Sequence, residues 1–247
     1  MMIVIMSSQM EGERSAEMIK RLIINITNLC NEYCPFCCVE ASPRGRNYMT
    51  LSTFQNILSS YSEDIEVQLT GGEPTLHPDF LDLVKCAIQY SNIKKLIIDT
   101  NGTDMENVAK DLNEISKGGN VPITMKLSVN YWLVQQHPDY LERVKNTLIN
   151  NPYINTFNIT LSIAHRLPEE MDKNIFNFLK DDALKANVYK IIHPIAYQGR
   201  AKKTKLANTC LEKMKITTAI SVGYATDGTC FGEDLDARNA YELVYNE

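Results

Sequence analysis

Short apolar runs rich in β-branched residues alternate with segments of helical periodicity through most of the chain. The runs predict six strands, at Leu22–Thr27, Glu66–Thr70, Lys95–Asp99, Ile123–Val129, Phe157–Ile163 and Val188–Ile192. Between them, apolar residues repeat at the spacing of one helix face, as at Leu51, Phe54 and Leu58, with Thr50 as the predicted N-cap. Strands separated by helices pair in parallel through right-handed crossovers, so the sequence predicts an α/β fold.

Six strand–helix steps fit two architectures, an open doubly wound sheet and an incomplete barrel, which periodicity does not distinguish. In both of them, ligands bind at the C-terminal ends of the strands. Residues 202–247 leave the pattern. There, Ile216–Tyr224 and Thr229–Phe231 predict a hairpin across the Asp227-Gly228 turn. The remaining residues, Glu233–Glu247, predict a short terminal helix.

The composition is that of a globular protein, with 247 residues, 44% of them hydrophobic and 22% charged. These values exclude a disordered or low-complexity chain. The net charge of −5 argues against binding to nucleic acid or to an anionic membrane, because both need a basic surface. No apolar run reaches the ~18 residues of a membrane span, and Met1–Met6 lacks the features of a signal peptide. We therefore expect a cytoplasmic protein.

Seven cysteines stand out in a chain expected in a reducing compartment. Three of them, Cys30, Cys34 and Cys37, form a C-x3-C-x2-C spacing directly after the first predicted strand, with Cys38 adjacent. Thiolates spaced this closely can converge on one centre, and sulfur ligands favour an iron–sulfur cluster or zinc. Three ligands on a cubic cluster would leave one iron open. The alternatives are a zinc knuckle with Cys38 or a histidine as fourth ligand, and a coincidental grouping.

Further polar groups fall at the ends of the next predicted strands. The second strand ends in Gly71-Gly72-Glu73-Pro74, in which the glycines permit positive φ and close approach of a ligand. Glu73 adds a carboxylate at that edge, and Pro74 restricts it to extended conformations. The alternative for this motif alone is a turn with a solvated glutamate. Asn101 follows the third strand, and Ser128 and Asn130 end the fourth.

Two of these motifs together resemble a known family. The C-x3-C-x2-C loop, with aromatic Phe36 just before its last cysteine, is similar to the signature of radical S-adenosylmethionine (radical SAM) enzymes. Gly71-Gly72-Glu73-Pro74 is similar to that family's motif for the methionine amino group. The two motifs occur in the family's order, each at a strand end, and the resemblance covers about residues 20–201.

The resemblance implies a partial (β/α)6 TIM-like barrel. It also implies a [4Fe–4S] cluster on Cys30, Cys34 and Cys37, whose open iron binds S-adenosyl-L-methionine. The family pattern further implies cofactor contacts from eight residues of this chain, namely Phe36, Gly71, Gly72, Glu73, Pro74, Asn101, Ser128 and Asn130. For Asn101 the alternative is a simple turn, and for Ser128 and Asn130 it is a pair of strand-end polar groups.

The C-terminal part resembles the subgroup of the family with a SPASM/twitch-like extension. Gly199-Arg200-Ala201 is similar to a segment of that subgroup, and Arg200 either pairs with a carboxylate or lies on the surface. Cys210 and Cys230 resemble a reduced auxiliary-cluster domain, but two cysteines are too few for a second cubic cluster, so we expect none. We therefore divide the chain into a radical SAM core, 1–201, and an extension of hairpin plus helix, 202–247.

The histidines give no independent signal. His77 is interpreted as a helix-start residue, and His137, His165 and His193 as rim or surface residues. Trp132 is either an aromatic wall of the site or ordinary packing.

The resemblance implies an enzyme that cleaves S-adenosyl-L-methionine reductively and uses the 5′-deoxyadenosyl radical to abstract hydrogen from a peptide or small-molecule substrate. It also implies an electron donor such as flavodoxin or ferredoxin. No catalytic residue is assigned. One alternative is an activase that places a radical on a partner protein. The other is a non-catalytic iron–sulfur or zinc protein.

Overall fold

The computed structural model of the chain describes residues 19–165, 173–181, 184, 188–195, 199–204 and 221–233. Eight strands lie within these residues: β1 Lys20–Thr27, β2 Ile65–Gly71, β3 Ile93–Thr100, β4 Ile123–Asn130, β5 Asn158–His165, β6 Val188–Pro194, β7 Ser221–Tyr224 and β8 Cys230–Glu233. The α-helices are α1 Leu51–Ser59, α2 Phe80–Ala87, α3 Met105–Ser116, α4 Tyr131–Gln136, α5 Tyr140–Asn150, α6 Lys173–Leu179 and α7 Arg200–Thr204. Two 3-10 turns complete the list, η1 Pro74–Leu76 and η2 Ile154–Thr156.

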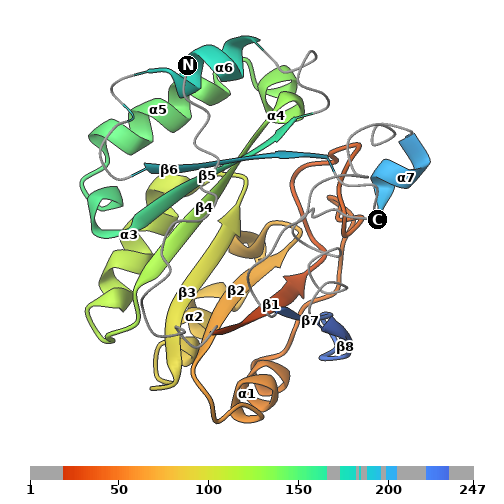
Figure 1. The fold of residues 1–247 in the computed structure, drawn as a ribbon, viewed down its shortest axis with the longest axis vertical. Coiled ribbons are helices and arrows are strands. Elements are labelled where there is room, and N and C mark those ends of the chain that lie inside the picture. Colours follow the sequence, from red (N-terminus) through yellow and green to blue (C-terminus); the bar gives the residue numbers. More distant parts are fainter. Residues whose placement is uncertain are drawn as a thin grey trace, which may run out of the picture.

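All eight strands belong to one sheet with the order β6-β5-β4-β3-β2-β1-β7-β8. The strands from β6 to β7 pair in parallel, and β8 is antiparallel to β7. The first six strands follow their chain order across the sheet, without the reversal that a doubly wound sheet requires. The sheet does not close on itself, so the predicted partial barrel is confirmed. Figure 1 shows the helices arranged around the outside of this curved sheet.

The sheet buries its outer face against the helices. In β2, Val67 and Leu69 are fully buried, and they join one hydrophobic cluster with helix residues such as Phe54 and Leu83. Because side chains alternate along a strand, the intervening residues, such as Gln68, face the inside of the curve. The alternation continues across neighbouring strands, since Gln68 is in register with Ile97. The hydrophobic core therefore lies between sheet and helices, and the inner face carries buried polar side chains such as Gln68 and Thr124.

Local signals in the sequence explain where several helices begin. The predicted N-cap Thr50 accepts a hydrogen bond from the backbone N–H of Thr53 at 3.1 Å, which satisfies a donor in the first turn of α1. Pro74 is the first residue of η1, a position that needs no backbone N–H. His77 ends η1 and is buried, with its ring nitrogen 3.0 Å from the Met49 carbonyl. These residues hold the segments that follow β1 and β2 against each other.

The predicted C-terminal hairpin forms, but it is not separate from the sheet. Its first strand, β7, pairs in parallel with β1, with Arg21 opposite Ser221 and Ile24 opposite Tyr224. The hydroxyl groups of Tyr61 and Tyr224 are 2.7 Å apart and add a second connection. Of the expected first strand, Ile216–Tyr224, the structure describes β7, Ser221–Tyr224, and β8 extends beyond the expected end at Phe231. The predicted terminal helix and Cys210 lie outside the described residues.

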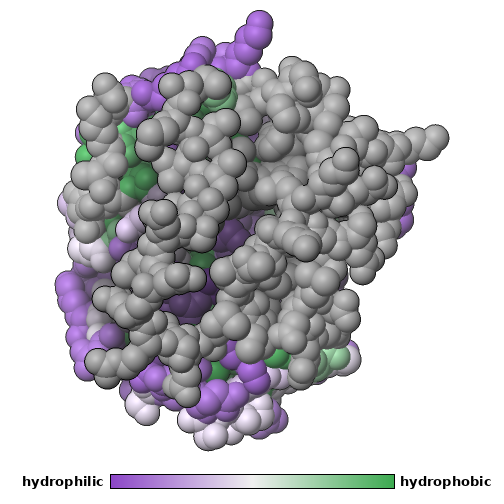
Figure 2. All heavy atoms as spheres, viewed as in Figure 1, coloured by the Kyte–Doolittle hydropathy of each residue, from purple (hydrophilic) through white to green (hydrophobic). Residues whose placement is uncertain are grey.

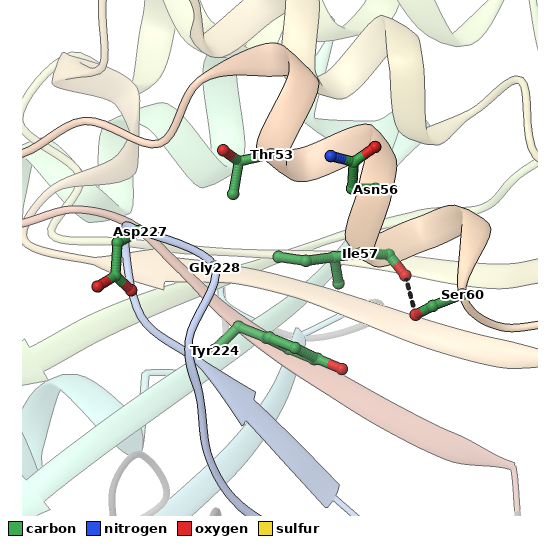
Figure 3. A pocket seen from close by; sticks show the side chains of 7 residues that line it. All are labelled: Thr53, Asn56, Ile57, Ser60, Tyr224, Asp227 and Gly228. Carbon is green, nitrogen blue, oxygen red and sulfur yellow. Dashed lines mark hydrogen bonds between the residues drawn. The ribbon is translucent and has the colours of Figure 1, made fainter.

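The turn between β7 and β8 lies near α1. The turn requires a φ of +86° at Gly228, a backbone conformation that residues with a side chain rarely adopt. A shallow hollow separates the turn from α1, lined by Thr53, Asn56, Ile57, Ser60, Tyr224, Asp227 and Gly228 (Figure 3). Within the described residues, no helix is both long and apolar enough to cross a membrane.

Candidate cluster and cofactor site

The cysteine loop is anchored at both ends to the strand that precedes it. The backbone N–H of Cys30 donates to the Ser42 carbonyl at 3.1 Å, and the N–H of Ser42 donates to the Asn28 carbonyl at 3.2 Å. Inside the loop, the N–H of Cys37 donates to the Cys34 carbonyl at 3.2 Å, which forms a turn between the second and third cysteines. The loop is therefore a compact excursion at the C-terminal end of β1.

The three cysteines predicted as cluster ligands lie close together. Burial raises the pKa of the Cys30 thiol to about 12, and the nearby charge of Cys37 acts in the same direction. Burial raises the pKa of Cys34 as well, again with charge repulsion from Cys37 and from Cys30. Three ionised thiols at this site would repel one another in a poorly solvated place, so they need a cationic centre to become thiolates. This donor set fits a metal cluster.

The distances between the described side chains decide whether they could hold a single zinc ion, the alternative to an iron–sulfur cluster. Among the described residues, no three Cys, His, Asp or Glu side chains form a group that could hold one metal ion. In a cubic cluster each thiolate binds a different iron, so its ligands lie farther apart than those of a single zinc ion.

Arg200 braces the cysteine loop from the other side of the barrel. Its guanidinium donates to the carbonyl of Cys34 and, at 2.6 Å, to the carbonyl of Ala41, and its backbone N–H donates to Cys37 at 2.9 Å. The side chain is buried and lies over the Tyr33 ring, 3.7 Å from its centroid. The interpretation of Arg200 as a surface residue was wrong, because the side chain is buried and its guanidinium donates to two backbone carbonyls. Figure 1 shows α7 beside the orange-red segment that follows β1.

Gly199 makes this brace possible. It has a φ of +51°, and a Cβ at this position would lie 2.3 Å from the Cys38 carbonyl oxygen. Only glycine allows the chain before α7 to approach the cysteine loop this closely.

The two glycines of the Gly71-Gly72-Glu73-Pro74 motif serve a close backbone contact. The N–H of Gly72 donates to the Thr27 carbonyl at 2.7 Å, and the N–H of Glu73 donates to the Leu29 carbonyl at 2.8 Å. A Cβ on Gly72 would lie 2.0 Å from the Leu29 carbonyl oxygen. The glycines thus allow the segment after β2 to pack against the start of the cysteine loop, which joins the two predicted motifs.

Glu73 is buried within this junction. Its Oε1 accepts hydrogen bonds from the hydroxyls of Thr75 at 2.7 Å and Thr100 at 2.9 Å, and its Oε2 accepts from the Asn101 N–H at 2.6 Å. Burial raises the pKa of Glu73, although these hydrogen bonds act in the opposite direction. An oxygen that accepts one hydrogen bond can accept another, so Oε2 keeps capacity for a ligand donor.

Asn101 connects Glu73 with the first cysteine. Its backbone binds Glu73, and its side-chain Nδ2 lies 3.9 Å from the Cys30 sulfur and 2.7 Å from Asn31 Oδ1. The structure therefore brings together three predicted site residues from the ends of β1, β2 and β3.

Three other predicted residues have visible structural contacts. Asn130 is buried, and its Oδ1 accepts from the Leu133 N–H at 3.0 Å, which caps α4. The Ser128 carbonyl accepts from the Tyr140 hydroxyl. Phe36 packs on Tyr131, with ring centroids 5.4 Å apart. The Phe36–Tyr131 contact places the cysteine loop against the start of α4, directly after β4.

Sequence reasoning missed the role of Glu32, which lies between the first two cysteines. Its buried carboxylate binds His137 Nε2 at 2.6 Å through Oε1 and accepts from Trp132 Nε1 at 3.2 Å through Oε2. His137 and Trp132 are therefore tied to the cysteine loop, and the His137 side chain is still 40% exposed, as expected of a rim residue. A glutamate inside the cysteine spacing was the only available signal. The side chains of His165 and His193 lie outside the described part.

The remaining cysteines fall into different places. Burial raises the pKa of the Cys38 thiol well above its ordinary value, and the nearby charges of Asp99 and Lys126 also act on this pKa. Cys38 thus lies near the inner face of β3 and β4. Cys86 lies in α2 and packs against the hydrophobic core. Cys230 opens β8, and the expected absence of an auxiliary cluster stays a prediction.

Comparison with known proteins agrees with this site. Residues 24–132 match the family model described as the radical SAM superfamily. The chain is 33% identical over 90 residues to a GTP 3′,8-cyclase of Actinobacillus pleuropneumoniae, covering 34% of this chain and 26% of that protein. It is 32% identical over 111 residues to the GTP 3′,8-cyclase of Pasteurella multocida, covering 43% and 32% of the two chains. The chain thus spans a third or less of the length of these relatives.

A solved structure shares the fold over a longer stretch. The structure of Streptococcus suis SuiB bound to precursor peptide SuiA superimposes with a TM-score of 0.50 and 14% identity, covering 93% of this chain and 62% of that one. Members of the matched superfamily use a [4Fe–4S] cluster and S-adenosylmethionine, and the cysteine trio suits such a cluster. The matching segment, residues 24–132, contains the cysteine loop, the glycine motif and the strands β2 to β4, so this part of the chain is similar to the radical SAM superfamily.

Proposed function

We propose that this chain is a radical SAM enzyme in which Cys30, Cys34 and Cys37 hold a [4Fe–4S] cluster. The observation that carries the proposal is the junction of Cys30, Asn101 and Glu73 at the ends of three neighbouring strands. When bound, the cluster and S-adenosylmethionine supply a 5′-deoxyadenosyl radical that removes hydrogen from a substrate. The substrate is a peptide or a small molecule, and the electron donor is a flavodoxin or ferredoxin.

The residues of the chain contribute binding, orientation and exclusion of water. The carboxylate of Glu73 keeps one oxygen available for the amino group of the cofactor's methionine part, and Asn101 fixes its position. Asn130 and Ser128 lie at the end of β4, at the same edge, as further cofactor contacts. Arg200 and Glu32 hold the cysteine loop so that its thiols stay oriented before any cluster binds. Phe36 packs at the border of the loop and shields it from water.

Two further features belong to this proposal. Residues 1–201 form the core and residues 202–247 the extension, although β7 of the extension pairs with β1 of the core. The protein acts in the cytoplasm, where reduced thiols and electron donors are available.

The test is cofactor cleavage by anaerobically reconstituted protein. We expect a brown protein with about four irons per chain, by the cluster stoichiometry, that converts S-adenosylmethionine to 5′-deoxyadenosine after reduction with dithionite. Brown protein that never cleaves the cofactor would indicate an electron carrier. Colourless protein that holds zinc would indicate a structural site. Transfer of the radical to a glycine of a partner protein would indicate an activase.

A further inference from the structure

The inner face of the sheet carries four buried side-chain oxygens that have no hydrogen-bond partner. Within the described residues, these atoms are Asn25 Oδ1, Gln68 Oε1, Asp99 Oδ1 and Thr124 Oγ1. Gln68 is fully buried and Thr124 is 4% exposed, so open solvent does not satisfy them. A buried acceptor without a partner is destabilising, and native proteins keep few of them. Four on one face therefore call for a partner that the protein itself does not supply, either a ligand or an ordered water.

The four oxygens lie in one patch. Thr124 is in register with Ile97, which is itself in register with Gln68. Asp99 is in register with Lys126 on β4, one step nearer the C-terminal ends of the strands. A hydrogen bond of 2.8 Å from Gln68 Nε2 to Asp99 Oδ2 connects the two levels. Asn25, on β1, completes the patch, which spans four adjacent strands.

The orientation of Gln68 follows from its neighbour. A carboxylate only accepts hydrogen bonds, so the Gln68 nitrogen must face Asp99 and its oxygen must face away. Lys126 Nζ is 3.8 Å from Asp99 Oδ1, beyond hydrogen-bond length, so that oxygen still has room for a donor. Three of the four unpartnered atoms only accept, and the fourth is a hydroxyl. The patch is therefore complementary to a group that brings N–H donors.

The patch lies beside the proposed reaction site. Asn25 is next to the glycine motif, since a Cβ on Gly71 would lie 2.3 Å from Asn25 Oδ1. Cys38, in the cysteine loop, is within reach of the charges of Asp99 and Lys126. Figure 2 shows hydrophilic surface at the bottom of a hollow in the face that Figure 1 presents. A group bound to the patch would sit between the inside of the barrel and the cofactor edge.

We infer that Gln68, Asp99, Thr124 and Asn25 form a recognition site for a nitrogen group of the substrate, an ammonium or an amide N–H. That the ligand is a substrate rests on the proposed function. The existence of the site does not, because it follows from the unpartnered oxygens alone.

The test uses reconstituted protein and three probes that share a carbon skeleton: butylammonium chloride, butyramide and sodium butyrate. Ligand-observed NMR measures their binding. We expect the ammonium and the amide to bind at millimolar concentration and the carboxylate not to bind. Equal binding of all three, or binding of none, overturns the inference.

Two near-isosteric variants remove single acceptors, Gln68→Leu and Thr124→Val. Each should weaken binding of the amine by about fivefold to tenfold, as expected for one lost hydrogen bond in a buried site. Thr124→Val should also leave the unfolding temperature unchanged or raise it, because it removes an unsatisfied polar atom, whereas Gln68→Leu also loses the hydrogen bond to Asp99 and should lower it. A fall in the unfolding temperature of Thr124→Val with unchanged binding would show that its oxygen already has a partner, and it overturns the inference. Gln89→Leu, at an exposed position, is the control.

The same samples separate this inference from the proposed function. Formation of 5′-deoxyadenosine is measured on each of them without any probe. Retained amine binding in a protein that never cleaves the cofactor would refute the proposed function and leave the site standing. Cofactor cleavage without selective binding of the amine and the amide would support the proposed function and overturn the recognition site.

Discussion

The outer and inner faces of the sheet are built from the same strands and have opposite chemistry. On the outer face, Leu69 and its neighbours are fully buried against helices, and each apolar contact adds to stability. On the inner face, Gln68 is equally buried but keeps an oxygen without a partner. Because strand residues alternate, one face can supply the free energy of folding while the other is left to bind ligands. Burial alone therefore does not identify a residue whose role is to stabilise the fold.

The cysteine loop belongs to neither face, since it lies at the edge where the strands end. Cys34→Ala should remove the cluster and abolish cofactor cleavage, which is the largest effect we expect, while the fold is retained. Iron analysis and detection of 5′-deoxyadenosine check this, with Cys86→Ala in α2 as the matched cysteine control. Full iron content and activity in Cys34→Ala would contradict the ligand assignment.

Shortening a side chain on the outer face should lower the stability of the fold. Leu69→Ala should lower the free energy of unfolding by about 2–5 kcal/mol, because it leaves a cavity in a well-packed core. Urea unfolding measures the loss. Set beside Thr124→Val, which removes an unpartnered oxygen on the inner face, it tests the contrast directly. A similar loss in both variants would show that the two faces do not differ in the way described.

The brace between α7 and the cysteine loop should have an intermediate effect. Arg200→Lys keeps the charge but loses the two-pronged contact with the carbonyls of Cys34 and Ala41. We expect about 1.5–3 kcal/mol less stability, the range for hydrogen bonds to a charged group. Reconstituted iron content should also fall. Lys110→Ala, at an exposed position of α3, is the control, and an equal loss there would refute a specific brace.

Glu73 should give the protein a pH-dependent stability. Its pKa is raised in the folded state, so the folded protein holds this proton more tightly than the unfolded chain. This contribution is fully present below the unfolded value of 4.5 and is lost as pH rises through the folded value. Relative to Glu73→Gln, the cofactor-free protein should lose stability on going upward from pH 4.5, by at most about 1.4 kcal/mol per pH unit. Urea unfolding across this range measures the difference in the free energy of unfolding between the two proteins. If the parent protein became more stable relative to Glu73→Gln as the pH rises, the prediction would be wrong.

The smallest effect is expected at the contact between Trp132 and Glu32. Trp132→Phe removes one donor to the buried carboxylate and keeps most of the aromatic packing. We expect a loss of about 0.5–1.5 kcal/mol, the usual contribution of one hydrogen bond. Thermal unfolding checks the value, with Trp132→Phe in a His137→Ala background as the second arm. Additive losses would show that the two contacts with Glu32 are independent.

Much of the fold could be read from local patterns. The six strands and the helix that begins after Thr50 depend on periodicity over a few residues, and the predicted ligand set of the cysteine loop depends on spacing. The edge of the sheet at which β7 is added could not be predicted from the sequence. The pairing of β7 with β1 joins residues that lie 200 positions apart, as Arg21 and Ser221 do. The glycine motif was recognised, but its contact with the backbone of Leu29 required the folded chain.

The sequence by itself determined the α/β alternation, the parallel sheet and the chemistry of three neighbouring thiols, because each of these is written in residues that are close in the chain. The tertiary structure alone decided what Arg200, Glu32 and the inner-face oxygens do. Arg200 reaches a carbonyl 166 residues away, and His137 reaches Glu32 over 105 residues. Such contacts depend on how the sheet curves and which strand ends meet, and no local pattern encodes that.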